Sequence, residues 1–223
     1  MQPDADRDSP IVVTGAAGFL GSHVVTRLLA AGRRVRATVR DLDNAPKRAY
    51  LDELRARSPE LLELFEADLM KPGSFDRCVD GAGAVIHTAA SVRLTARDHR
   101  NIVEPSVEGT RNVVASMLAA SVPRLVHTSS MAAVVRYKDA RRGPFDEQDW
   151  NDESRPADDP YGFAKTRAER DLWELHAGRS EDSRFTLSVL CPSLILGPIL
   201  APHHRRASPA IGRTASTGRP WAA

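Results

Sequence analysis

The sequence predicts an α/β fold, a doubly wound parallel sheet with helices on both faces, and three observations lead to this prediction. A buried apolar strand, Ile11–Val13, runs directly into a glycine-rich turn that opens a helix. Short apolar runs then alternate with helical patterns as far as Leu190. The 223 residues, of which 42% are hydrophobic, suffice for one well-buried domain and leave little room for a second.

The elements are expected in a regular order. Strands are expected where short apolar runs lie between turn residues, at 11–13, 35–39, 62–65, 84–87, 125–128 and 185–190. Helices are expected where apolar residues recur with helical periodicity, at 23–31, 51–57, 74–79, 107–120 and 161–176. Gly32 ends the first helix, which completes a βαβ unit with a right-handed crossover. Residues 136–159 are polar and rich in proline, which indicates a loop.

Three segments follow from this pattern. Residues 1–9 are expected to form a disordered tail, and residues 10–198 the α/β domain. Residues 199–223 show no apolar period, because 19 of these 25 residues are Ala, Arg, Pro, Gly, Ser or Thr, so this segment is expected to be poorly ordered. Adjacent His203 and His204 could bind a metal, but nothing nearby supplies further ligands, so they are expected to be solvated.

Composition excludes several classes of protein. The last 25 residues hold four Arg and no acid, so the preceding chain has 27 basic and 29 acidic residues, which gives no basis for nucleic-acid binding. Cys78 and Cys191 form no metal-binding or disulfide pattern, and the acidic N-terminus is not a secretory signal, so a cytoplasmic protein is expected. Pro192 and Pro198 interrupt the most apolar stretch, and no membrane segment is predicted.

The glycine-rich turn indicates a Rossmann-type dinucleotide site. Gly15, Gly18 and Gly21 are spaced three residues apart between a strand and a helix. Missing side chains there permit a tight turn and close approach of a pyrophosphate, which the helix N-terminus then faces. A lone glycine trio is a weak signal, since a loop that merely turns gives the same pattern. The βαβ context favours cofactor binding, and we include Phe19 and Leu20 in the site.

The end of the second strand favours NADP over NAD. An NAD-specific site usually places an acidic residue there, whereas this chain has Arg40, with Lys47 seven residues later. A guanidinium and an ammonium group can bind the 2′-phosphate that distinguishes NADP. In the alternative interpretation, both cations are merely solvated and Asp41 holds the ribose of NAD.

Tyr161 and Lys165 are candidate catalytic residues. They stand four residues apart on an expected helix, so both side chains leave the same face. Such a pair is common by chance and usually reflects packing. However, Ser129 and Ser130 follow the strand that ends at Thr128, and open α/β sheets place their chemistry at the carboxyl ends of strands. A phenol is a weak acid at neutral pH, so the positive charges of Lys165 and the nicotinamide would assist proton transfer.

Eight motifs together resemble a known family. They are TGAAGFLG, VRATVRD, NAPK, EADL, HTSS, FDEQDW, YGFAK and CPSLILGP, in this order between Pro10 and Pro198. The chain resembles the dihydroflavonol-reductase-like branch of the extended short-chain dehydrogenases/reductases, within the NAD-dependent epimerase/dehydratase family. This resemblance implies an NADP-dependent oxidoreductase that reduces the carbonyl of a small ketone or aldehyde. The same fold also contains nucleotide-sugar epimerases and dehydratases, which are the alternative.

The resemblance also implies roles for particular residues. Ser130, Tyr161 and Lys165 match the catalytic residues, and Lys165 also the ribose ligand. The remaining implied cofactor contacts are Arg40, Lys47, Asp68, Leu69, Ala89, Pro192 and Leu194. Ser106 stands where related enzymes often have an asparagine, which implies the loss of a proton-relay contact. We expect His87 to pack near the cofactor and Trp150 to anchor the long loop.

The residues after Pro198 depart from the family pattern. Related enzymes continue into a C-terminal substrate lobe, whereas this sequence has an Ala/Arg/Pro-rich segment, so a C-terminally truncated reductase is expected. A non-catalytic cofactor-binding remnant is therefore a second hypothesis. An apolar face without its lobe would promote homodimerisation or non-specific association.

Overall fold

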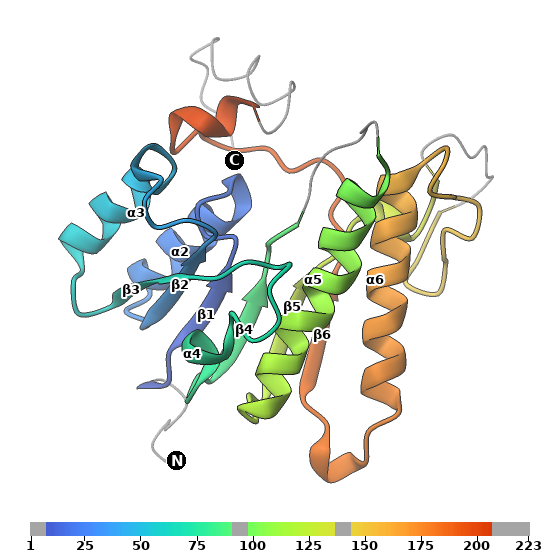
Figure 1. The fold of residues 1–223 in the computed structure, drawn as a ribbon, viewed down its shortest axis with the longest axis horizontal. Coiled ribbons are helices and arrows are strands. Elements are labelled where there is room, and N and C mark those ends of the chain that lie inside the picture. The colour runs from blue at the N-terminus through green and yellow to red at the C-terminus, as the bar shows by residue number, and fades with distance from the viewer. Residues whose placement is uncertain (1–7, 91–97, 137–143, 207–223) are drawn as a thin grey trace.

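The computed structural model describes residues 8–90, 98–136 and 144–206 (Figure 1). Its strands are β1 (Ile11–Thr14), β2 (Val35–Val39), β3 (Leu62–Glu66), β4 (Ala84–His87), β5 (Arg124–Thr128) and β6 (Thr186–Leu190). The helices are α2 (Phe19–Ala30), α3 (Ala45–Arg57), α4 (Asp76–Val79), α5 (Arg100–Ala119) and α6 (Pro160–Ala177). Short 3-10 segments follow at η1 (Met131–Ala133), η2 (Glu181–Ser183) and η3 (Pro202–Arg206).

The six strands form one parallel sheet in the order β3-β2-β1-β4-β5-β6, which confirms the predicted doubly wound fold. The order reverses beside β1, and ligands of open α/β sheets bind at the carboxyl ends of the strands at such a switch point. Each predicted strand agrees with an observed one to within one residue. In the described ranges, no helix is long and apolar enough to cross a membrane.

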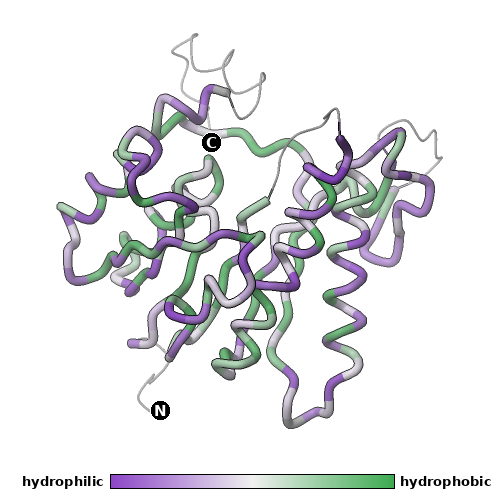
Figure 2. The backbone as a smooth tube through the Cα atoms, viewed as in Figure 1, coloured by the Kyte–Doolittle hydropathy of each residue, from purple (hydrophilic) through white to green (hydrophobic). Residues whose placement is uncertain are grey.

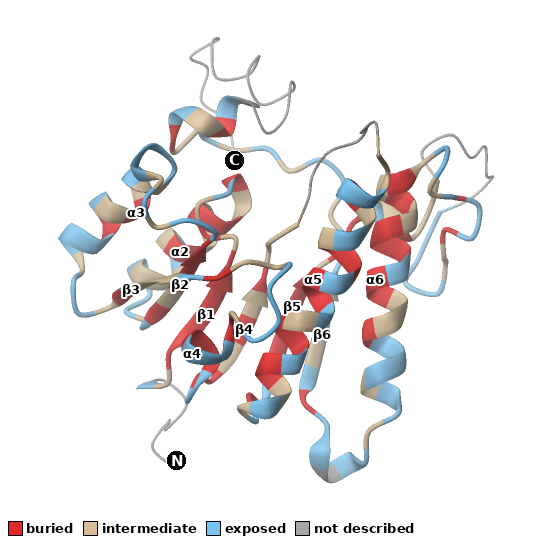
Figure 3. Cartoon of the chain, viewed as in Figure 1, coloured by how far each residue is buried: buried red, intermediate tan, exposed pale blue. Residues whose placement is uncertain are grey.

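Alternation along β1 divides the core into two layers. Val12 packs into a cluster with Val79 of α4 and Met117 of α5, while Val13, on the opposite face, packs with Val25 of α2. Hence α2 and α3 cover one face of the sheet and α4, α5 and α6 cover the other. All four β1 residues are buried (Figure 3), and the strand is largely hydrophobic (Figure 2), as expected for a parallel strand covered on both faces.

Three helices begin earlier than their apolar periods predicted. α2 begins at Phe19 rather than at His23, directly after the glycine turn. α3 begins at Ala45 rather than at Leu51, because the Asn44 side chain caps it by accepting a hydrogen bond from the Lys47 N–H. α5 begins at Arg100 and contains Pro105. The proline cannot make the helical hydrogen bond of its position, and Ile102, three residues earlier, is 0% exposed.

Candidate active site at the carboxyl ends of the strands

The glycine turn after β1 leaves no room for side chains. Gly15 has a φ of +66°, and a Cβ there would lie 2.8 Å from the Ala89 Cα. A Cβ on Gly21 would lie 2.3 Å from the Gly15 carbonyl oxygen. These contacts are closer than real Cβ atoms show, so the backbone of the turn, the first turn of α2 and the segment after β4 can pack together only with glycine at both positions.

The N-terminus of α2 offers unpaired donors at this turn. The Gly18 N–H bonds to the Gly15 carbonyl, and the Ser22 N–H to the Gly18 carbonyl, both at 2.9 Å. The N–H groups of Phe19, Leu20 and Gly21 find no backbone acceptor within the described residues. Such donors and the helix dipole suit an anion, so the chain's own groups fit the pyrophosphate of a dinucleotide.

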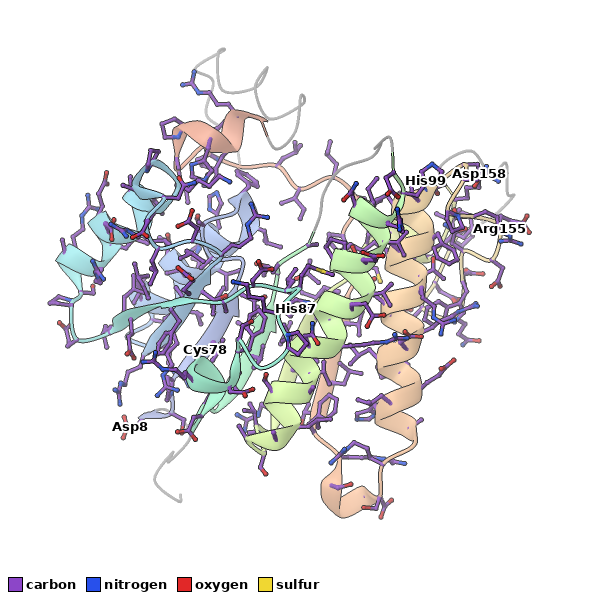
Figure 4. The ribbon with its side chains drawn as sticks, in the orientation of Figure 1. Asp8, Cys78, His87, His99, Arg155 and Asp158 are labelled. Atoms are coloured by element: carbon purple, nitrogen blue, oxygen red, sulfur yellow. The ribbon has the colours of Figure 1, made fainter. Side chains whose placement is uncertain are left out.

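A chain of hydrogen bonds holds Ala89 against the turn. The Thr14 Oγ1 accepts the N–H groups of Thr88 and Ala89, each at 3.2 Å, so its own proton is directed to the His87 Nδ1, 2.7 Å away. The His87 Nε2–H then faces the Thr110 Oγ1 at 3.3 Å, and Thr110 donates to the Ser106 carbonyl. His87 thus fastens β4 to β1 and α5, as expected for a packed residue (Figure 4).

Ser106 lies inside α5. Its hydroxyl donates to the Ile102 carbonyl one turn earlier in α5, and its side chain is buried. The hydroxyl is therefore used within its own helix.

His87 and His127 form a buried imidazole pair, with ring centroids 5.4 Å apart. Burial lowers the pKa of His87 to about 3 and holds that of His127 well below its usual value. Neither nitrogen of His127 has a hydrogen-bond partner among the described residues. Both rings therefore stay neutral in the folded protein.

This pair predicts a loss of stability in acid. An unfolded histidine takes up a proton near pH 6.5, whereas the folded pair resists protonation to much lower pH, so the unfolded state binds more protons below pH 6.5. The free energy of unfolding should therefore fall as the pH drops below 6.5, by about 1.4 kcal/mol per pH unit for each histidine. In His127→Leu this slope should decrease by about that amount. Urea unfolding at a series of pH values measures it.

The matched control is His99→Gln, at the partly exposed N-cap of α5, which should keep the wild-type slope. If the slope of His127→Leu equals that of the wild type, the buried pair does not determine the acid sensitivity.

Arg40 and Lys47 border the loop that follows β2, and both are exposed. In the part of the chain that the structure describes, neither forms an ion pair. The Asp41 Oδ1 accepts the Asp43 N–H at 2.9 Å, so one of its carboxylate oxygens closes its own turn. The neighbouring Arg48 is engaged by Asp52 and by the Leu42 carbonyl.

Asp68 and Leu69 lie just beyond β3. The Asp68 Oδ1 accepts the Met70 N–H at 2.9 Å. The Ser74 hydroxyl accepts the Asp68 N–H and donates to the Asp68 carbonyl. Leu69 packs so closely on α5 that a Cβ on Gly109 would lie 2.8 Å from the Leu69 Cβ. Leu69 is therefore fixed against α5, and Ser74 holds Asp68 next to it.

Lys165 is brought to the end of β5. Its Nζ donates to the Thr128 carbonyl at 3.0 Å, and the residue is 5% exposed. Burial lowers the pKa of Lys165 to about 8, an effect that the charge of Glu169 partly opposes. Tyr161 stands one turn earlier on α6 and is half-buried. Ser130, at the start of η1, is buried, and its Oγ accepts the Ala132 N–H.

The segment after β6 runs beside Ser130. The Ser129 N–H bonds to the Leu190 carbonyl at 2.8 Å, and the Met131 N–H to the Pro192 carbonyl at 3.0 Å. Pro192 therefore lies next to the candidate catalytic serine. Leu194, two residues later, is 59% exposed.

Asn151 is a residue near the site that the sequence pattern did not indicate. It is buried and donates through Nδ2 to the Ala132 carbonyl at 2.7 Å, while its own N–H bonds to the Ala133 carbonyl. Through Ser154 it connects to Asp159, whose side chain caps α6 at the Gly162 N–H. The Asp159-Pro160 pair at the helix start was a usable signal for this cap. Trp150 contributes as expected for a loop anchor, since the Arg170 guanidinium lies 4.8 Å from its ring.

The prediction that His203 and His204 are solvated is wrong for His204. That side chain is 1% exposed and packs edge-on against Phe19, and the Nε2 atoms of both histidines lie within 3.1 Å of the Ala17 carbonyl oxygen. His23 of α2 meets the Pro198 carbonyl at 3.0 Å. Residues 198–204 thus cross the N-terminal end of α2 (Figure 1). Residues 207–223 lie outside the described ranges.

Sequence comparison decides the family. The profile of the 3-beta hydroxysteroid dehydrogenase/isomerase family matches residues 12–216. The chain belongs to this family. It is 39% identical to tetraketide alpha-pyrone reductase 1 of Arabidopsis thaliana over 198 residues, which cover 86% of this chain and 59% of that protein. Dihydroflavonol 4-reductase of Arabidopsis thaliana is 34% identical over 197 residues, with 85% and 50% covered. The resemblance to dihydroflavonol reductases is confirmed.

Solved structures agree with this assignment. The yeast methylglyoxal/isovaleraldehyde reductase Gre2, complexed with NADPH, is 28% identical with a TM-score of 0.75, and the match covers 85% of this chain and 59% of Gre2. Vestitone reductase from alfalfa (Medicago sativa L.) is 27% identical with a TM-score of 0.70, with 87% and 60% covered. The chain spans 50–61% of the length of the curated relatives with which it was compared.

Proposed function

We propose that the chain is an NADP(H)-dependent oxidoreductase of the short-chain type that reduces the carbonyl of a small ketone or aldehyde to an alcohol. The observation that carries the proposal is the location of Lys165, whose ammonium group is held by the Thr128 carbonyl at the carboxyl end of β5, two residues before Ser130. The glycine turn lies at the same edge of the sheet. The names of the relatives, which are reductases, support the same reaction class.

Three residues would share the proton chemistry. Ser130 would donate a hydrogen bond to the substrate carbonyl, and Tyr161 would deliver the proton to its oxygen. Lys165 would bind the nicotinamide ribose and assist Tyr161 with its positive charge. NADPH, when bound, supplies the hydride.

Arg40 and Lys47 support the choice of NADP over NAD. Both are exposed, Arg40 at the end of β2 and Lys47 in the first turn of α3, and neither forms an ion pair in the described ranges, so they are available to a 2′-phosphate. The turn made by Asp41 does not favour a ribose-binding role for that residue. Pyrophosphate would meet the N–H groups of Phe19 and Leu20. Asp68 and Leu69 would contact the adenine, and Ala89, Pro192 and Leu194 would border the nicotinamide half.

Arg40→Ala should weaken NADPH binding about 10- to 100-fold, the loss expected when one charge-assisted hydrogen bond of about 1.5–3 kcal/mol is removed. NADH binding should stay unchanged, because NADH carries no 2′-phosphate. Quenching of protein fluorescence, titrated with each cofactor, measures both constants. Arg34→Ala, an exposed arginine on the loop before β2, is the control. Equal affinities for the two cofactors in the wild type would contradict the assignment.

The reaction itself is tested with a panel of ketones and aldehydes, by following the loss of NADPH absorbance. Turnover of an ordinary enzyme, about 1 s⁻¹ or more, would support a competent reductase. If monodisperse protein that binds NADPH turns over no member of the panel, the proposed reaction is overturned for this chain, while the cofactor assignment stands.

A further inference from the structure

A buried glutamate lies behind the Tyr161–Lys165 pair. Glu169 follows Lys165 by four residues, so Tyr161, Lys165 and Glu169 succeed one another along one face of α6. Glu169 is 7% exposed. A carboxylate buried this deeply needs hydrogen-bond partners to offset its lost hydration, and such partners identify what it holds.

Three donors from three parts of the chain converge on this carboxylate. The Ser129 Oγ donates to its Oε2, as does the Cys191 Sγ at 3.5 Å, and the Trp173 Nε1 donates to its Oε1 at 3.4 Å. A carboxyl group that accepts at both oxygens behaves as the ionised, acceptor-only form. Glu169 therefore connects α6 to the end of β5 and to the segment after β6, the two places that position Ser130.

Glu169 also supplies a negative charge one turn after Lys165 on α6, although the two side chains form no ion pair among the described residues. The other titratable groups near the ammonium are Tyr161 on its own helix, His87 of β4, His127 of β5 and Cys191 after β6. Burial lowers the pKa values of both histidines, and partial desolvation of the thiol together with the nearby Glu169 raises that of Cys191 to about 11, so these three are neutral at pH 7. The Glu169 charge raises the pKa of Lys165, against the lowering caused by burial.

We propose that Glu169 is a positioning residue, which locks the Ser129–Ser130 segment at the end of β5 and supplies the counter-charge for the buried Lys165 one turn earlier on α6. The effect on Lys165 holds whatever reaction the chain performs, whereas the consequence for turnover rests on the proposed function. A neutral Lys165 would lose the charge that assists Tyr161. Replacing Glu169 should therefore act through Lys165, even though Glu169 itself touches no substrate.

The charge of Lys165 can be measured without any reaction. The chain has four lysines, so protein labelled with ¹³C at the lysine ε position should give four resolvable signals, and Lys165→Arg assigns the relevant one. In the wild type this signal should titrate with a pKa of about 8. In Glu169→Gln, which keeps an acceptor for Ser129 but removes the charge, the pKa should fall by about one unit. Glu174→Gln, an exposed glutamate on the same helix, is the matched control and should change nothing.

A second variant keeps the proposal testable if Glu169→Gln does not fold. Glu169→Asp retains the charge with a shorter side chain, and it should keep the Lys165 pKa close to the wild-type value. The proposal is overturned if Glu169→Gln leaves the Lys165 pKa unchanged, or if Glu174→Gln lowers it equally. It is also overturned if Glu169→Asp lowers the Lys165 pKa by about one unit, the fall that is expected for Glu169→Gln.

Kinetics separate this proposal from the proposed function. Lys165 loses its proton as the pH rises through its pKa, so kcat should decline on the alkaline side, and Glu169→Gln should move that decline to lower pH by the same amount as the NMR titration. Matching shifts support the link to turnover, whereas an unmoved kcat profile overturns that part. If no variant turns over any substrate, the proposed function fails while the lysine titration still decides the role of Glu169.

Discussion

Tyr161→Phe is expected to reduce turnover by about 100-fold or more, the usual contribution of a positioned general acid. The substitution removes one hydroxyl from a half-buried side chain at the start of α6 and leaves the ring in place. The proton that the substrate oxygen needs must then come from water, which is a weaker and unpositioned acid. Steady-state kinetics with the best carbonyl substrate of the panel give kcat, and fluorescence titration gives the NADPH affinity, which should change little.

The same chemical change elsewhere in the chain provides the control. The Tyr50 hydroxyl hydrogen-bonds to the Thr26 Oγ1 at 3.0 Å, between α3 and α2 and away from the end of β5. Tyr50→Phe should lower stability by about 1 kcal/mol, the usual net contribution of one hydrogen bond, and leave kcat unchanged. Near-normal turnover of Tyr161→Phe would remove the tyrosine from the mechanism.

Local patterns in the sequence were sufficient to predict the strands. Each strand is a short segment that contains two or more apolar residues, and β1, which is buried on both faces, is apolar in three of its four residues, so its composition alone identifies it. The apolar periods failed to predict the first residues of the helices, because a single local contact can determine where a helix begins. Asn44 starts α3 with its side chain, and α5 begins five residues before Pro105, although the apolar period shows neither start.

The candidate site divides in the same way. Gly15, Arg40 and Lys165 belong to motifs of contiguous residues, so sequence alone could nominate them. The buried contacts of Glu169 and His204 could not be predicted from the sequence, because their partners are distant in the chain. Glu169 meets Ser129 across 40 residues, and His204 meets Ala17 across 187. The four-residue spacing after Lys165 was the only local signal for Glu169.

Gly15→Ala should abolish detectable cofactor binding and destabilise the fold by about 3 kcal/mol. Two costs add at this position. A non-glycine residue in left-handed backbone costs about 1–2 kcal/mol, and forcing a methyl group into packed backbone costs about 1–3 kcal/mol. The new Cβ would meet the Ala89 Cα at 2.8 Å and its N at 2.9 Å, and Thr14 holds that segment in place by accepting the Ala89 N–H. Because backbone cannot swing away as a flexible side chain can, the turn itself must shift, and the N–H groups of α2 move with it.

Gly32→Ala separates these two costs. Gly32 has a φ of +69°, nearly that of Gly15, but a Cβ there would meet nothing within 4 Å. Gly32→Ala should therefore lower the free energy of unfolding only by the cost of left-handed backbone, about 1–2 kcal/mol. It should bind NADPH as the wild type does. Urea unfolding and NADPH titration of both variants give the comparison. If Gly15→Ala binds NADPH normally, or is no less stable than Gly32→Ala, then the close approach of Ala89 to the turn does not shape the cofactor site.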